Sequence, residues 1–95
     1  MNKEILERFK SLSLEIDIQV RLYPISSDNF IQFYNYYFFI KNNNILTDKE
    51  LISLADSLAN AEIFSNDIEK IEKVKKIKKI LATDVANYKI NFIRI

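Results

Sequence analysis

Hydrophobic and polar residues alternate over a long stretch near the start of the chain. From Leu12 to Leu22 every second residue is aliphatic, and every residue between them is polar or charged. Side chains two positions apart point to the same face of a β-strand, so the alternation predicts a strand with one face in the core and one facing water. Pro24 and the following ISSDN sequence predict that this strand ends in a loop.

The aromatic stretch FIQFYNYYFFIK, residues 30–41, fits two kinds of element. A helix would gather its aromatic residues on one stripe. The members of that stripe would be Phe30, Phe33, Tyr34, Tyr37 and Phe38. Aromatic residues favour a pleated surface, and the preceding loop suits a hairpin, so we interpret the stretch as a second strand.

Helical spacing appears in three other places. Residues 2–10 predict a short N-terminal helix. Thr47 and Glu50 form a capping-box pattern, which predicts the start of a helix over residues 48–61. Residues 68–80, IEKIEKVKKIKKI, predict a third helix capped by Ser65 or Asn66. Its wider apolar seam has a mean step of 3.5 and would cross its neighbour obliquely; the members of the seam are Phe64, Ile68, Ile71, Val74, Ile77, Leu81 and Val85.

Alternation returns after Thr83, where Tyr88, Ile90 and Phe92 are separated by polar residues. This pattern predicts a C-terminal strand. The expected fold is therefore a single α+β domain over residues 1–95, in the order α-β-β-α-α-β. Three helices would lie mainly on one face of a small antiparallel or mixed three-stranded sheet.

Composition removes many kinds of chemistry. The 95 residues contain no glycine, no histidine and no cysteine. Without glycine there is no Walker loop, dinucleotide fingerprint or nucleophile elbow, and without histidine the commonest metal ligand and neutral-pH base are missing. Turns with positive φ must then use Asn or Asp, and Asn42–Asn44 is the obvious position. We expect no enzyme activity, no cofactor and no metal site.

The abundance of Ile, Lys, Asn, Phe and Tyr suggests an AT-rich genome. The N-terminal sequence MNKEILERFK has charges where a signal peptide needs an apolar segment, and no apolar run reaches the length of a membrane span. We therefore expect a cytoplasmic protein that does not enter a membrane.

The lysine-rich segment can be a solvated helix face, a nucleic-acid contact or a contact with a protein partner. Residues 73–95 hold seven basic and one acidic residue, although the net charge of the chain is only +1. A nucleic-acid contact would use Lys73, Lys75, Lys76 and Lys79. The near-neutral total instead favours a solvated helix face, with the lysines at the C-terminal end of the helix where its dipole stabilises them.

The polar face of the predicted sheet is the candidate binding surface. Its residues would be Glu15, Asp17, Arg21, Gln32, Tyr34 and Tyr36. Tyrosines suit protein interfaces and also stack on unpaired bases, so both kinds of partner stay open. The face can also be covered by the N-terminal helix or by a second copy of the chain. Glu15 and Asp17 have no accompanying histidine or third ligand, so we do not interpret them as catalytic.

These features predict a small non-enzymatic protein that binds a macromolecular partner and occludes its surface. Inhibitors, immunity proteins, antitoxins and phage anti-defence proteins of the anti-CRISPR type are such proteins. One alternative is a single-stranded nucleic-acid binder that uses the same tyrosines with the lysines. Another is a structural subunit that forms a homodimer through the aromatic strand.

Overall fold

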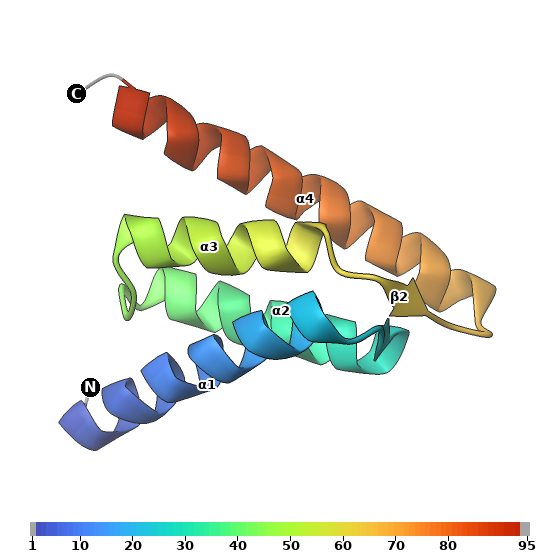
Figure 1. The fold of residues 1–95 in the computed structure, drawn as a ribbon, viewed down its shortest axis with the longest axis horizontal. Coiled ribbons are helices and arrows are strands. Elements are labelled where there is room, and N and C mark those ends of the chain that lie inside the picture. The colour runs from blue at the N-terminus through green and yellow to red at the C-terminus, as the bar shows by residue number, and fades with distance from the viewer. Residues whose placement is uncertain (1, 94–95) are drawn as a thin grey trace.

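A computed structural model describes residues 2–93 and is almost entirely helical (Figure 1). Its elements are α1 (Lys3–Leu22), β1 (Ile25–Ser26), α2 (Ser27–Asn42), α3 (Asp48–Ala59), β2 (Ile63–Phe64) and α4 (Ile68–Ile93). The order helix, strand, helix thus occurs twice. The two short strands pair in parallel, with Ile25 opposite Ile63 and Ser26 opposite Phe64. The predicted α+β fold with a three-stranded sheet is therefore wrong.

The first predicted strand is the second half of α1, which continues the N-terminal helix predicted for residues 2–10. An aliphatic residue at every second position also suits a helix. Residues two positions apart are rotated by about 200° and lie on opposite faces, whereas residues four positions apart are rotated by about 40° beyond a full turn and share a face. Leu12, Ile16 and Val20 therefore share the buried face, while the other aliphatic residues lie on the opposite face. Alternation alone cannot distinguish this arrangement from a strand.

The second predicted strand is α2, so the helical interpretation of the aromatic stretch is the correct one. Ser26 supplies the helix cap missing from the prediction, because its hydroxyl accepts a hydrogen bond from the Asn29 N–H at 3.2 Å. Phe30, Tyr37 and Ile40 are buried on one face of α2. Burial of that face outweighs the low helix propensity of aromatic residues.

The capping box at the start of α3 is confirmed. The Thr47 N–H donates to the Glu50 carboxylate at 3.0 Å, and the Glu50 N–H donates to the Thr47 hydroxyl at 3.3 Å. Asn44 lies in the preceding loop with φ of 53°, which confirms the expectation that Asn supplies a left-handed position there.

The third predicted helix is longer than expected. Asp67 caps α4, since its carboxylate accepts from the N–H groups of Glu69 at 2.9 Å and Lys70 at 3.4 Å. The predicted caps Ser65 and Asn66 precede it. The helix then runs through Thr83 to Ile93, so the predicted C-terminal strand is also wrong.

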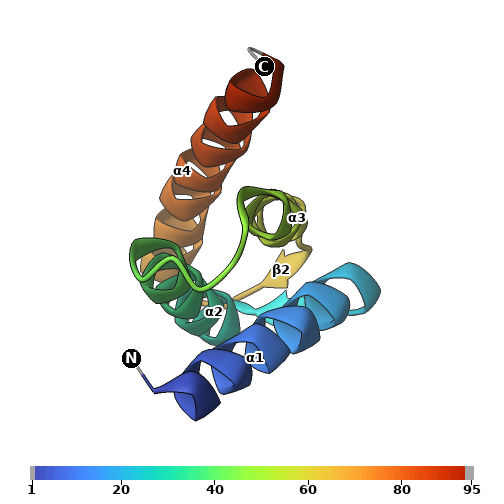
Figure 2. The same ribbon diagram turned by 90° about the vertical axis from the view of Figure 1, so that its left-hand side faces the viewer.

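The core lies where the four helices meet. The helix α3 packs against each of the others, and α1 and α4 lie on different sides of it (Figure 2). Among residues 68–90 of α4 the buried residues are Val74, Ile77, Leu81 and Val85, which confirms that part of the predicted seam. Phe64 and Ile68, the first residues of the seam, are exposed.

Candidate binding surfaces

The six residues predicted for a sheet face lie on two helices, and no sheet surface brings them together. Glu15, Asp17 and Arg21 are on α1, whereas Gln32, Tyr34 and Tyr36 are on α2. Tyr34 and Tyr36 are partly buried against the core. The Gln32 amide donates to the Tyr36 hydroxyl at 3.3 Å, one helical turn away. The tyrosines therefore do not form an open stacking platform.

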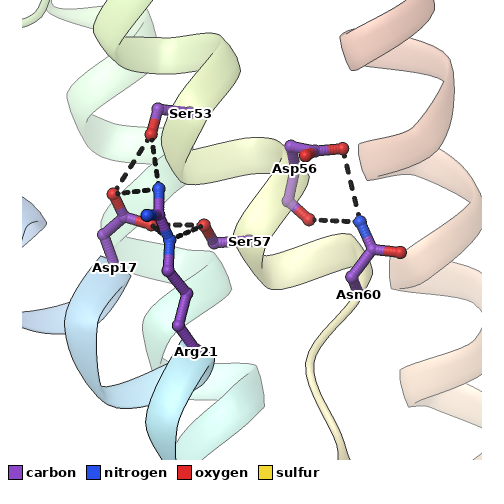
Figure 3. A network of polar contacts seen from close by, with 6 residues as sticks. All are labelled: Asp17, Arg21, Ser53, Asp56, Ser57 and Asn60. Carbon is purple, nitrogen blue, oxygen red and sulfur yellow. Dashed lines mark hydrogen bonds and ion pairs between the residues drawn. The ribbon is translucent and has the colours of Figure 1, made fainter.

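Asp17 is the centre of a polar network between α1 and α3 (Figure 3). Its two carboxylate oxygens accept from Arg21 Nε and Nη2, each at 3.1 Å. The hydroxyls of Ser53 and Ser57 on α3 donate to the same carboxylate, and Arg21 donates to both hydroxyls at 3.0 Å. The Asp17 side chain is only 16% exposed. It joins two helices of its own chain.

A second polar cluster lies between α2 and α4. The Tyr37 hydroxyl and the Lys41 ammonium both donate to the Asp84 carboxylate, at 2.7 and 3.1 Å. The Lys41 ammonium also lies 5.9 Å from the centre of the Tyr88 ring. Burial, followed by the hydrogen bonds with Tyr88 and Asp84, raises the pKa of Tyr37 far above its ordinary value. Every member has a partner within the cluster, so it is a structural contact between helices.

The most exposed apolar surface on α1 is a ridge of three aliphatic residues, Leu14, Ile18 and Leu22. We call it the α1 ridge. Their exposed fractions are 61%, 57% and 65%, whereas Ile16 on the opposite side of the helix is 1% exposed. They are spaced four residues apart, which places them along one line of the helix. The sequence signal for this ridge was the alternation itself, once it is placed on a helix.

Polar residues border the α1 ridge. On a helical wheel Glu15 and Arg21 lie about 60° to either side of it, and both are exposed. An apolar centre with a polar rim is the usual anatomy of a protein–protein interface. Two of the six predicted contact residues therefore do border an exposed surface, although that surface is helical.

The four lysines proposed for nucleic acid, Lys73, Lys75, Lys76 and Lys79, are all exposed on α4. The helix continues for 14 residues beyond Lys79, since it ends at Ile93. They therefore lie in its second to fourth turns, and stabilisation by the C-terminal dipole cannot explain them, because that effect is confined to the last turn. Lys75 pairs with Glu72 at 3.4 Å.

Within residues 2–93, no group of three acidic side chains is arranged to hold a metal ion. Every helix in this range is too short or too polar to span a bilayer. Comparison of the chain with protein-family models, with curated proteins and with solved structures finds no significant match.

Proposed function

We propose that the protein is a non-enzymatic binding module that occludes the surface of a protein partner through the α1 ridge. The observation that supports it is the ridge itself, three large aliphatic side chains each more than half exposed on the helix face opposite the core. Aliphatic anchors at positions i, i+4 and i+8 are typical of a helix that docks in an apolar groove. The expected partner surface is such a groove.

The proposal includes the class of protein and its compartment. A chain without histidine, cysteine or glycine lacks the common equipment for catalysis, so binding is the activity it can best supply. Inhibitors, immunity proteins and anti-CRISPR-type proteins act in this way. The lack of cysteine suits the reducing cytoplasm, which is the compartment we propose for the protein and its partner.

The test is a photo-crosslinking amino acid at position 18, with position 83 as the matched control. Ile18 lies in the ridge, whereas Thr83 is exposed on α4. We expect a specific protein adduct from position 18 alone in the source cells. The partner would then be purified, and its affinity for a variant with Leu14→Gln, Ile18→Gln and Leu22→Gln should fall at least about tenfold.

Three outcomes would contradict the proposal. An adduct with a second copy of the chain alone would show that the ridge mediates self-association. Binding to single-stranded nucleic acid that weakens steeply with salt and is lost with the four α4 lysines would favour the nucleic-acid alternative. Equal affinity of the triple variant would show that the partner contacts another surface.

A further inference from the structure

A groove lies between the β2 segment and the N-terminal half of α4, two elements whose places in the fold are labelled in Figure 1, and no residue of α1 lines it. Its volume is about 560 Å³, within the range of sites that bind ligands. One wall is formed by residues 61–65 and the other by α4. The residues that matter for the inference are Ile63, Phe64, Ile71, Val74, Lys75 and Lys78.

The strand edge at this groove is open. The sheet has two strands, and β2 pairs with β1 along one edge only. No residue of β1 lines the groove, which places the groove on the side of β2 away from β1. An unpaired strand edge offers backbone N–H and C=O groups to an extended peptide, which binds by adding a strand.

The floor of the groove is apolar. Val74 is buried, and Ile63 and Ile71 are half-buried beside it. Phe64 is 58% exposed on the strand side. Side chains of an added strand alternate in direction, so one apolar side chain of a bound peptide could pack on Ile63 and Ile71.

A partly buried cation, Lys78, lines the groove. The Lys78 ammonium donates to the Ala61 carbonyl just beyond the end of α3, and it pairs with no carboxylate of residues 2–93. Burial lowers the pKa of Lys78, as expected for a desolvated cation without a counter-charge. Lys75 is beside it and is held only by the exposed pair with Glu72.

We propose that this groove binds an extended peptide segment that carries an apolar side chain and a single carboxylate. The peptide backbone pairs with the open edge of β2, the apolar side chain packs on Ile63 and Ile71, and the carboxylate meets the Lys78 ammonium. Glu62 lies on the same wall and is exposed, so a run of acidic residues would be repelled. The carboxylate is that of the peptide's C-terminus, which supplies one negative charge for Lys78 without an acidic side chain near Glu62.

This site is on different elements from the α1 ridge, so the two proposals can fail separately. Random seven-residue peptides with a free C-terminus, displayed on phage, would be selected on the immobilised full chain. The selected sequences would be synthesised with a fluorophore, once with a free and once with an amidated C-terminus. Fluorescence polarisation then gives their affinities: loss of binding on amidation would support the terminal carboxylate as the ligand, and equal affinity after amidation would overturn the proposal.

Lys78→Gln should weaken binding of the selected peptides about tenfold, because it removes a charge-assisted hydrogen bond. Lys76→Gln is the matched control, since Lys76 is exposed on α4 and does not line the groove, and it should leave the affinity unchanged. Lys78→Gln also removes a contact with Ala61, so its fold is checked by circular dichroism. Phe64→Ser alters an exposed residue and provides a second variant that folds, with an expected loss of a few-fold.

Amide chemical shifts on peptide addition locate the site directly. Shifts centred on residues 61–65 and 71–78 would support the proposal. Failure to select any peptide, equal affinity for Lys78→Gln and the wild type, or shifts centred on the α1 ridge would overturn it.

Discussion

The hydroxyl of Tyr37 on α2 donates a 2.7 Å hydrogen bond to the carboxylate of Asp84 on α4, joining residues 47 positions apart. The Tyr37 side chain is fully buried, whereas Asp84 is 15% exposed. The bond fixes the C-terminal half of α4 against α2, in a region where Lys41 supplies the counter-charge. A buried carboxylate of this kind is stable only while its donors remain.

Tyr37→Phe should therefore lower the free energy of unfolding by about 1.5–3 kcal/mol, the usual value of a hydrogen bond to a charged group. Urea denaturation followed by circular dichroism measures the change. Tyr36→Phe is the matched control, because the Tyr36 hydroxyl only accepts an exposed bond from Gln32. Its effect should stay within about 0.5 kcal/mol. Equal losses in the two variants would show that the Asp84 contact is not special.

The same cluster makes the protein sensitive to alkali. The pKa of Tyr37 is raised above its ordinary value of 10.0. Burial lowers the pKa of Lys41, but the hydrogen bond and charge of Asp84 outweigh it and raise this pKa above 10.5. Both groups hold their proton more tightly in the folded state, so their stabilisation is complete below about pH 10 and is lost as pH rises further. Stability should fall above pH 10 in the wild type and fall less steeply in Tyr37→Phe.

Asp17 and Glu15 allow a matched comparison of two acidic residues on one helix. Asp17 binds Arg21, Ser53 and Ser57, whereas Glu15 is exposed. Asp17→Ala should cost about 1.5–3 kcal/mol of unfolding free energy, because four donor contacts are lost. Glu15→Ala should change it by less than about 0.5 kcal/mol. Thermal unfolding of both variants checks this, and a larger effect of Glu15→Ala would contradict the described network.

The capping box of α3 predicts sensitivity to acid. The backbone N–H of Thr47, followed by its side chain, holds the pKa of Glu50 below its ordinary value of 4.5. A carboxyl with a lowered pKa contributes stability above its unfolded pKa and loses it as pH falls through the folded value. Thr47→Ala should cost about 1 kcal/mol at pH 7 and less below pH 4.

Glu50→Gln is the control for this prediction. Glutamine can also accept the Thr47 N–H, so the cap remains, but it does not titrate. Its unfolding free energy should therefore depend less on pH between 5 and 3 than that of the wild type. Parallel pH profiles of the two proteins would show that Glu50 makes no contribution to acid sensitivity.

Asn44 is the left-handed residue between α2 and α3, with φ of 53°. The Cβ atom disfavours this conformation by about 1–2 kcal/mol in every residue except glycine, and asparagine offsets part of that cost with local hydrogen bonds of its side chain. Asn44→Ala should therefore destabilise the protein by about 1 kcal/mol, whereas Asn44→Gly should not. Chemical denaturation of the two variants measures the difference. Equal stability of the two would mean that the loop does not need the left-handed position.

Local signals predicted the features that depend on a few neighbouring residues. The capping box at Thr47, the left-handed Asn44 and the buried residues Val74 and Ile77 all follow from short patterns and are confirmed. The first and third predicted strands were wrong because period-2 alternation also matches positions i and i+4 of a helix. The second was wrong because burial of one helix face outweighed the β-propensity of its aromatic residues. Whether such a segment forms a strand or a helix depends on which of its side chains other elements cover, and that is decided by tertiary packing. The two polar clusters join residues more than 30 positions apart, so no local pattern could show them.

The α1 ridge gives a direct test of this distinction between helix and strand. In a strand, the six aliphatic residues from Leu12 to Leu22 would share one buried face, and replacing any of them would destabilise the protein. In α1, the ridge residues Leu14, Ile18 and Leu22 are exposed, whereas Ile16 and Val20 are buried. Ile18→Gln should thus change the unfolding free energy by less than about 0.5 kcal/mol, and Ile16→Ala should lower it by about 2–5 kcal/mol. Urea denaturation at low protein concentration separates these effects from any association through the ridge. A large loss in Ile18→Gln under those conditions would mean that the ridge is covered within the monomer, and the proposed contact surface would then be wrong.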